Sequence, residues 1–340
     1  MSEIGLTLVV PGLLGPIPQA HDEGFPSPDC AELERGLSKS SVCASPLISF
    51  EAALFSQFGL DPAASSFPVA ALTWLADFDS VPEGNWVRAD PVHLQADQDS
   101  VLLFGGPSIE IHINEVEPIV ERFDELFGDD GYQLIPGAIN RWYLKLPGED
   151  YPVVDSLNDV NGHDINYRLP QGVESRHWRQ LINEIQMMMH GLELNRTRES
   201  NGEPVLNGLW LWGGGSLPDS AHCDAGQIFA NDPLSRGLAK LAGTAAQPLP
   251  VSFSTQRCDQ GSMLAVFTEL HDIIATGALY HWPDWVKQFN QQWIVPALDS
   301  LTDGKIDRLR VIPCQGQQFD LTRGNLKYFW RRVKPLISRL

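Results

Sequence analysis

Carboxylates and an imidazole are combined in the segment DVNGHD, residues 159–164. Such donors bind zinc and other divalent metal ions, so Asp159 and His163 are candidate metal ligands. The same letters also fit an Asn-Gly turn with solvated polar neighbours. The residues alone leave both interpretations open.

A second group of donors lies in ELHDIIATGALYHW, residues 269–282. His271 and Asp272 are adjacent, and adjacent residues of a helix point in different directions, so these two cannot hold one ion from one face. A surface or helix-capping role is the simpler interpretation of this group, which also contains Glu269 and His281.

Two further features could serve phosphate chemistry. In LWLWGGG, residues 209–215, a strand-like alternation runs into three glycines, which can direct backbone N–H groups at a phosphate. The run lacks the spacing of the dinucleotide fingerprint and of the P-loop, so a tight turn is favoured. Ser49 precedes a predicted helix, where its hydroxyl could be a nucleophile facing the helix dipole or could cap the helix.

Composition limits the partners and the compartment. The 340 residues include 24 basic and 43 acidic side chains, a formal charge of −19. Nucleic-acid binding needs clustered Lys and Arg, and the same charge repels anionic lipid, so we expect no nucleic acid and no membrane as partner. The five cysteines form no Cys-x-x-Cys pair, and MSEIGLTLVV fits a buried strand better than a signal, so we expect a cytoplasmic protein.

Apolar periodicity predicts the elements that would position these residues. The run 4–10 fits a parallel strand buried on both faces. Ser49 and Gly59 stand where an N-cap and a C-cap would flank a helix. An aromatic stripe over 282–293 and three methionines at 187–189 are interpreted as core packing. Helices are predicted over 28–40, 49–60, 114–131, 177–192, 233–243, 262–277, 282–301 and 325–340. Strands are predicted over 100–106, 108–114, 207–212 and 308–313, and 131–147 is predicted as two strands around a Pro-Gly turn.

The pattern of predicted secondary structure changes twice along the chain. Residues 1–75 and 205–340 have α/β character, whereas 76–204 has α+β character. The predicted organisation is a core domain in two parts, 1–75 and 205–340, with an inserted α+β domain at 76–204.

The segment LELNRTRESNGEPVLNGLWLWGGG, residues 192–215, carries a spaced pattern of Asn195, Arg198, Gly202, Pro204 and Asn207. It resembles a stretch of the archaeal-type cofactor-independent phosphoglycerate mutases of the alkaline phosphatase superfamily. Other pieces keep that family's order: LVVPGLLG at 8–15, FGLDP at 58–62 and PLSRGLAKLAG at 233–243. The chain also resembles a divergent proteobacterial set labelled phosphoglycerate mutase or regulatory protein, in which ADPVHL and LWLWGGG recur together.

The resemblance implies an α/β fold with an alkaline-phosphatase-like three-layer core and an inserted α+β domain. It also implies two divalent metal ions, a serine phosphorylated in transit and the isomerisation of 3- to 2-phosphoglycerate. Ser49 lies close to the family's nucleophile position and is the candidate catalytic residue. A cleft between core and insert would bind substrate through Asn195, Arg198, Asn207, Trp212, Gly213 and Gly214.

The sequence departs from the family at the metal ligands. The family's first strand ends in Asp-Gly, whereas this one ends in Pro11-Gly12. Its Asp-x-x-Gly-His-Asp motif and its final Gly-Asp-His turn should fall where this chain reads ELHDIIATGALYHW and VIPCQGQQF. DVNGHD imitates the former motif but lies out of order, in the insert. We therefore predict no metal ligands, no cofactor, and a catalytically degenerate protein that binds a small phosphorylated or anionic ligand or has a regulatory role.

Two rival hypotheses stay open. One is an active phosphomutase or phosphatase with two divalent metal ions, Mn or Zn, in a rearranged site drawing on Asp159, His163, His271 or His281. The other is a protein partner bound by a basic, aromatic C-terminal helix that carries Trp330, Arg331 and Arg332.

Overall fold

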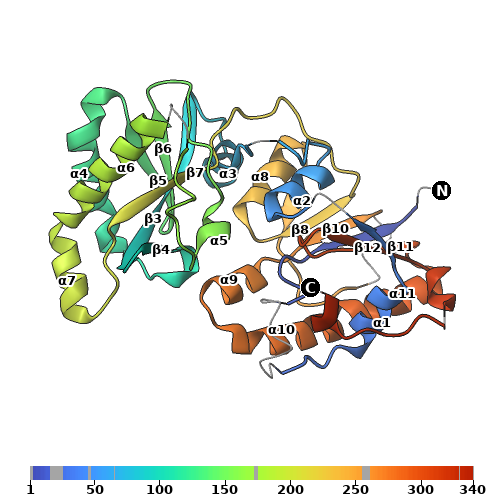
Figure 1. Ribbon diagram of the computed structural model, residues 1–340. Coiled ribbons are helices and arrows are strands. Elements are labelled where there is room, and N and C mark those ends of the chain that lie inside the picture. Colours follow the sequence, from blue (N-terminus) through green and yellow to red (C-terminus); the bar gives the residue numbers. More distant parts are fainter. Residues whose placement is uncertain are drawn as a thin grey trace. The chain divides into compact units, whose positions relative to one another are not determined.

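The computed structural model describes residues 3–15, 26–44, 47–64, 66–171, 175–254, 261–328 and 330–339. The chain divides into two compact units, and Figure 1 shows them coloured along the sequence. Unit 1 comprises Met1–Ala64 and Ser220–Leu340, and unit 2 comprises Ser65–Asp219. Unit 2 is therefore inserted into the chain of unit 1.

Unit 1 is built on a seven-stranded sheet. Its central strand, β1 (Gly5–Val9), pairs in parallel with β10 (Met263–Val266) on one side and β11 (Arg308–Ile312) on the other. The parallel strands run the same way, so their carboxyl ends meet at one edge, which we call the carboxyl edge. Beyond β10 lie the parallel strands β8 (Gln227–Ala230) and β9 (Ala246–Gln247). Beyond β11 lies β12 (Gln317–Thr322), which is antiparallel to β11, and then β2 (Ser41–Ala44), which is antiparallel to β12.

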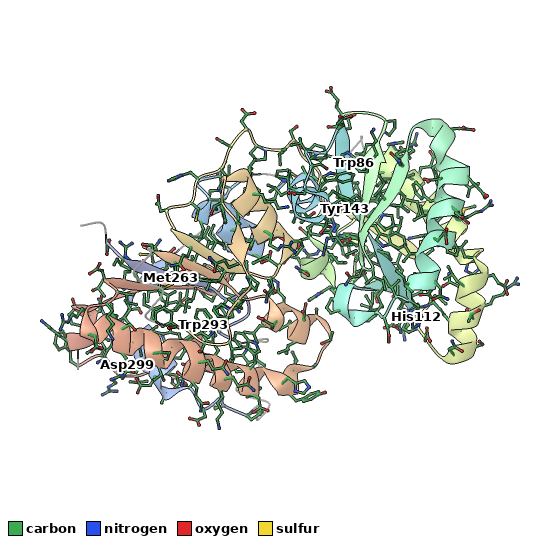
Figure 2. All side chains as sticks on the ribbon, turned by 180° about the vertical axis from the view of Figure 1, so that it is seen from behind. Trp86, His112, Tyr143, Met263, Trp293 and Asp299 are labelled. Carbon is green, nitrogen blue, oxygen red and sulfur yellow. The ribbon has the colours of Figure 1, made fainter. Side chains whose placement is uncertain are left out.

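Helices cover both faces of this sheet, which makes three layers. Figure 1 shows α2 and α8 on one face and α1, α10 and α11 on the other. The second face is apolar and includes Leu6, Leu8 and Met263, which pack with Trp293 in one buried cluster (Figure 2). The helices of unit 1 are α1 (Ala31–Lys39), α2 (Phe50–Gln57), α8 (Pro233–Leu241), α9 (Glu269–Ala275), α10 (Trp282–Phe289), the π-helix η6 (Asn290–Ile294) and α11 (Val295–Asp303), with 3-10 turns η5 (Leu279–His281), η7 (Asn325–Lys327) and η8 (Leu336–Arg339).

Unit 2 is an antiparallel sheet with helices, in the α+β style. Its long strand β3 (Asn85–Asp97) pairs successively with β6 (Arg141–Leu146), β7 (Gly208–Trp212) and β4 (Ser100–Gly105), and β6 pairs with β5 (Gln133–Ala138). The main core lies between the sheet and two helices, α4 (Ile113–Phe127) and α6 (Ser175–His190). The other helices are α3 (Val69–Phe78), η2 (Gly106–Ser108), η3 (Gly128–Asp130), α5 (Leu157–Val160) and α7 (Glu193–Asn201).

The insertion is wider than the predicted range 76–204. Residues of α3 pack with Trp86 and Tyr143 in a small aromatic cluster (Figure 2). Arg141 donates to Asp77 at 2.6 and 2.7 Å, and Tyr143 donates to the same carboxylate at 2.6 Å. Burial alone would raise the pKa of Asp77, but these hydrogen bonds lower it. Because α3 packs on this sheet and β7 is one of its strands, unit 2 extends from Ser65 to Asp219, beyond the predicted range.

Two predicted elements have a different secondary structure. Residues 262–277 are predicted as one helix but form β10 followed by α9, because a short buried apolar run fits a central strand as well as a helix. Residues 108–114 are predicted as a strand, yet the structure has no strand there, and Ile113 begins α4. The strand pair within 131–147 is confirmed, although Pro136 lies inside β5 at a bulge and not in the turn.

The predicted C-terminal helix over 325–340 is wrong. Its described residues form only the short η7 and η8, joined by a segment that runs along α1. Arg331 donates to the carbonyl of Ser40 at 2.7 Å, and the backbone N–H of Leu336 donates to Glu34 at 2.8 Å. Leu336 and Ile337 are buried in the core of unit 1, so this segment is part of the domain.

Two of the remaining interpretations concern packing, and the structure confirms most of each. The aromatic stripe over 282–293 contributes three buried side chains and the half-buried Trp285 to the core of unit 1. Met188 and Met189 are buried in unit 2, whereas Met187 is exposed. None of the described helices combines the length and hydropathy that a transmembrane span requires.

Candidate functional site

The carboxyl edge of unit 1 is the first place to look for a site, because open parallel sheets bind ligands outside the carboxyl ends of their strands. Here β1, β10 and β11 end level with one another. The N–H of Val10 donates to Ile312 O at 2.8 Å, and the N–H of Phe267 donates to Val9 O at 2.9 Å. The segments after these three strands therefore share one edge.

The turn after β1 packs mainly against apolar side chains, and the amide of Gln315 accepts from Leu14 N and donates to Gly15 O, both at 3.2 Å. Leu13 and Leu14 are buried, and the indole N–H of Trp282 donates to Gly12 O at 3.0 Å. Gly12 has φ +80°, and a Cβ there would lie 2.5 Å from Cδ1 of Ile274 on α9. The turn thus needs glycine both for its backbone conformation and for the close approach of α9.

Ser49 lies near this edge and caps α2. Its Oγ accepts a hydrogen bond from Ala52 N at 3.1 Å, which confirms the capping interpretation. The carbonyl of Leu47 accepts from Gly316 N, just beyond β11, at 3.4 Å. Gly59 follows the helix with φ +66°, as the predicted C-terminal signal requires. The catalytic role of Ser49 stays a prediction.

His271 lies on α9, beside the start of α2. Its ring meets that of Phe50 edge to face, with centroids 5.6 Å apart. Burial lowers the pKa of His271 to about 4, so the imidazole is neutral at pH 7. The neighbouring Asp272 has a raised pKa, from burial and from the charge of Glu269.

These side chains do not fit the two metal ions that the resemblance implies. Such a pair of ions needs several carboxylates and imidazoles that converge. Among the residues that the structure describes, no three His, Cys, Asp or Glu side chains form a group that could hold a metal ion. The position that corresponds to the family's first carboxylate is Pro11, inside the apolar turn.

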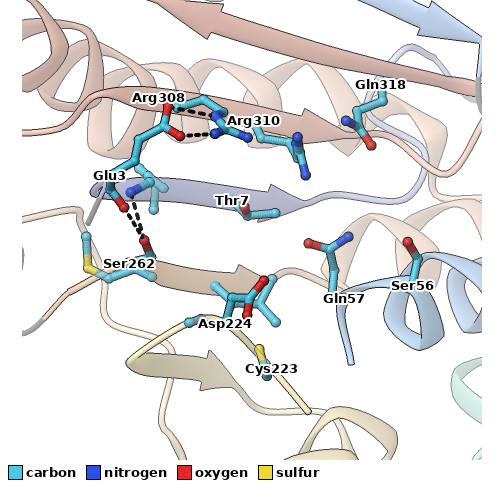
Figure 3. Close-up of a pocket in the computed structure, with 15 residues that line it drawn as sticks. Glu3, Thr7, Ser56, Gln57, Cys223, Asp224, Ser262, Arg308, Arg310 and Gln318 are labelled. Atoms are coloured by element: carbon cyan, nitrogen blue, oxygen red, sulfur yellow. Dashed lines mark hydrogen bonds and ion pairs between the residues drawn. The ribbon is translucent and has the colours of Figure 1, made fainter. Parts of the chain in front are cut away.

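A polar cavity of about 380 Å³ opens on the α2 face of the same sheet, toward the amino ends of the parallel strands (Figure 3). Thr7, Arg310 and Gln318 come from three neighbouring strands, and Ser56 and Gln57 come from α2. This half of the face carries polar side chains, whereas the opposite face of the sheet is apolar. Its volume is within the usual range for a small-molecule site, about 300–1,000 Å³.

Two arginines of this cavity are held in place by carboxylates. Arg308 pairs with Glu3, as Figure 3 shows. Arg310 donates from Nε to Asp320 at 2.7 Å, and Asp320 also accepts from Gln318 at 2.9 Å. The terminal nitrogen Nη2 of Arg310 donates to the other oxygen of Asp320 at 3.4 Å, and Arg310 lines the cavity. The guanidinium is therefore fixed while part of it faces the cavity.

The six predicted substrate-binding residues all lie in unit 2, whereas Ser49 lies in unit 1. Asn195 is buried, and its amide donates to Met189 O and Leu206 O and accepts from Leu206 N, at 2.8 to 2.9 Å. Asn207 pairs with both backbone groups of Leu94, at 2.7 and 2.9 Å. Both asparagines therefore hold the α7–β7 connection in place through hydrogen bonds to neighbouring backbone groups.

Arg198 is the most enclosed of the predicted residues. Its guanidinium donates to both oxygens of Glu115 at 2.9 and 2.7 Å, to Pro204 O at 2.6 Å and to Glu110 O at 2.8 Å. Both members of the ion pair are buried. An incoming anion would have to displace Glu115, so these contacts give Arg198 a structural role.

Trp212 and the glycines after it also pack within unit 2. The indole N–H of Trp212 donates to Asp90 at 2.8 Å. Gly213 has φ +65°, and its carbonyl accepts from Ala70 N at 2.9 Å. A Cβ at Gly214 would lie 2.7 Å from Tyr151. The glycines allow close approach of α3 and the 151 loop, and the role of these residues toward a substrate stays a prediction.

Asp90 is the centre of a buried hydrogen-bond network, and the sequence did not indicate this role. It is fully buried on β3 and accepts from Arg88, from the indole of Trp212 and from Trp142 N at 2.6 to 3.2 Å. Arg88 also lies over the ring of Trp212, 5.2 Å from its centroid. The alternation in ADPVHL was the available signal, but Pro91 obscured it, because proline argues against a central strand.

The DVNGHD segment, residues 159–164, is hydrogen-bonded to β4 of unit 2. Asn161 accepts from Gly105 N at 2.9 Å, and Asp164 accepts from Val101 N at 3.1 Å. Burial raises the pKa of Asp159, which accepts from Ser156 Oγ at 2.8 Å. His163 contacts Asn161 O at 2.9 Å. The turn interpretation accounts for these contacts.

Comparison with known proteins gives the family context of this geometry. No model of a known protein family matches the chain. The chain is 25% identical over 202 residues to a probable 2,3-bisphosphoglycerate-independent phosphoglycerate mutase of Geobacter sulfurreducens, over 57% of this chain and 50% of that relative. It is 22% identical over 141 residues to the 2,3-bisphosphoglycerate-independent phosphoglycerate mutase of Methanosarcina mazei, over 39% and 35%. The matches span half or less of these relatives' length.

The chain resembles the archaeal-type cofactor-independent phosphoglycerate mutases. Among solved structures, the PH0037 protein from Pyrococcus horikoshii is similar, with a TM-score of 0.52 and 12% identity over 95% of this chain and 88% of that one. The predicted fold class is confirmed: the fold is α/β, an alkaline-phosphatase-like three-layer core with an inserted α+β domain.

The neutral, half-buried His271 predicts a pH dependence of stability. The folded-state pKa of about 4 lies below the unfolded-chain value of about 6.5, so the unfolded chain takes up a proton first as the pH falls. Between pH 7 and pH 4 this residue should cost about 2–3 kcal/mol of unfolding free energy. His271→Phe should remove that loss in urea unfolding, whereas the exposed His281→Phe should not. Parallel curves for wild type and His271→Phe would contradict the half-buried, neutral imidazole.

The enclosed ion pair of Arg198 predicts a stability effect. Arg198→Met leaves Glu115 buried without its cation, which should cost about 3–5 kcal/mol in urea unfolding. Arg196→Met is the matched control, because its pair with Glu193 is exposed and should contribute about 0–1 kcal/mol. Wild-type stability together with lost anion binding in Arg198→Met would instead make Arg198 a ligand-binding residue.

Proposed function

We propose that this phosphoglycerate-mutase-like protein lacks two-metal phosphoryl transfer and serves as a ligand-binding or regulatory protein. The observation that carries the proposal is the apolar closure of the turn after β1. Trp282 and Ile274 approach Gly12 closely, at the place where a metal-holding carboxylate would be needed. An ion there would be desolvated without a ligand to compensate for the lost water.

Phosphoryl transfer depends chiefly on neutralising charge on the transferred group. A serine hydroxyl without metal ions leaves that charge unopposed. Ser49 instead uses its oxygen as the cap of α2, and the nearby His271 is enclosed with Phe50. The residues at the carboxyl edge thus support packing in place of the family's chemistry.

The test of lost catalysis combines metal content with a mutase assay. We expect the purified protein, dialysed against Mn²⁺ or Zn²⁺ and then desalted, to keep no stoichiometric metal. It should not convert 3- to 2-phosphoglycerate with added Mn²⁺, and the Methanosarcina mazei relative serves as positive control. Bound metal with turnover that disappears in Ser49→Ala would overturn the proposal in favour of an active phosphomutase with a rearranged site.

The ligand in this proposal is a small anionic or phosphorylated molecule, bound in the cavity beside α2. Arg310 lines that space and is oriented by Asp320. Figure 3 shows Thr7 and Gln57 facing the same cavity, where they add a hydroxyl and an amide. A guanidinium with neutral donors beside it is a typical arrangement for one carboxylate or phosphate group, and the exposed Asp224 also lines this cavity.

Calorimetric titration with 3-phosphoglycerate tests this assignment. We expect one saturable site, and Arg310→Gln should weaken binding by tenfold or more, since a hydrogen bond to a charged group contributes about 1.5–3 kcal/mol. The exposed Arg332→Gln removes the same charge elsewhere and should leave binding unchanged. Equal affinities in the two variants would exclude this cavity as the anion site. A protein partner at Trp330 and Arg332, which are both exposed, stays a separate prediction.

A further inference from the structure

A second, smaller cavity of unit 1 has a different chemistry. It has a volume of about 180 Å³ and lies beside the carboxyl ends of β8 and β10. Its walls come from Asn231 after β8, from the segment Phe267–Glu269 after β10, and from α10 and η6. It shares no lining residue with the cavity beside α2.

Aromatic rings form much of the wall. Phe267 is at the centre of the group and meets Trp285, Phe289 and Trp293 edge to face, with centroids 4.9 to 6.0 Å apart. Trp285 and Phe289 are stacked at 5.2 Å. Edge-to-face packing fixes the rings, so this wall is rigid, and aromatic faces attract cations through their quadrupole.

One carboxylate belongs to the same lining. Glu269 lines the cavity, and its Oε2 is buried without a hydrogen-bond partner among the described residues. An unsatisfied buried oxygen is costly, and such exceptions in native structures call for an explanation. Because almost none of the surface of Oε2 is accessible, a donor inside the cavity would reach this oxygen after a rotation of the Glu269 side chain.

The remaining polar lining is neutral. Asn231, Gln288 and Gln292 contribute amides, and none of the described residues that line the cavity is a lysine or an arginine. Gln292 and Trp293 come from the π-helix η6, and π-turns inside longer helices occur frequently at functional sites. Among the described lining residues the only formal charge is therefore negative, on a chain whose net charge of −19 also attracts cations.

We propose that this cavity binds a primary ammonium group of a small molecule. The rings would attract the cation and contact its hydrocarbon part, and an ammonium N–H would donate to the free oxygen of Glu269. A quaternary ammonium lacks that donor, an anion would meet the carboxylate, and a metal ion would find a single charged ligand. A primary ammonium fits the rings and the carboxylate together.

The inference is independent of the proposed function, because the two depend on different residues. Metal content and mutase turnover decide whether catalysis is lost. Ammonium binding decides whether the aromatic cavity is a site, and either proposal can fail while the other stands.

The experiment is calorimetric titration of the full chain with n-butylammonium chloride at low ionic strength. We expect one saturable site. The neutral isostere n-butanol should bind at least tenfold more weakly, and tetramethylammonium should also bind more weakly, because neither can offer a charged N–H to Glu269. This comparison needs no variant, so it is unaffected by folding defects.

Variants then assign the binding to the cavity. Glu269→Gln should reduce n-butylammonium affinity by tenfold or more, and Trp285→Leu should also reduce it. Asp284→Asn is the matched control, since it removes an exposed carboxylate of α10 that does not line the cavity, and should leave affinity unchanged. Absence of saturable binding, equal binding of n-butanol, or equal affinities of Glu269→Gln and Asp284→Asn would each overturn the inference.

Discussion

Unit 1 depends on the position of β1 between β10 and β11. The three strands come from the two ends of the chain, with Leu6 opposite Met263 and Leu309 across the sheet. Parallel strands cannot be joined by a tight turn, so every neighbour of β1 must be reached through a long connection. Because the sheet closes only when residues more than 250 positions apart meet, a whole second unit can be inserted between them at little cost to the pairing.

The same strand arrangement explains why the carboxyl edge matters chemically. When parallel strands end level with one another, the residues that follow them lie close together at one edge of the sheet. Enzymes with such sheets bind their ligands at this edge. In this chain, that place is filled by α9 and Trp282, which pack against a glycine-containing turn. The same strand ends could bring metal ligands together, but in this chain they support a hydrophobic contact. Under the proposed function the fold is kept without the chemistry, as is expected when function resides in individual side chains.

Unit 2 shows how residues that look functional can serve packing. Arg198 and Asp90 are both charged and buried, and both are surrounded by partners that satisfy their hydrogen bonds. Buried charges of this kind require nearly complete networks, so each one restricts the residues around it. The spaced pattern of Asn195, Arg198 and Asn207 then reflects the shape of the α7–β7 connection. The resemblance to the mutases was recognised in this same segment. Because its residues serve packing, the resemblance is evidence about the fold.

The sequence by itself determined the local elements whose signals lie within a few residues. Ser49 and Gly59 mark the ends of α2, and the apolar run of β1 marks a strand buried on both faces, because caps and periodicity act locally. Only the tertiary structure decided that Met263–Val266 is a strand, since a short buried run takes its form from its neighbours. It alone assigned β7 to unit 2 and enclosed Arg198 with Glu115, 83 positions away. Contacts between distant residues leave no mark in the spacing of either one, so the partners of a charged side chain follow from the fold.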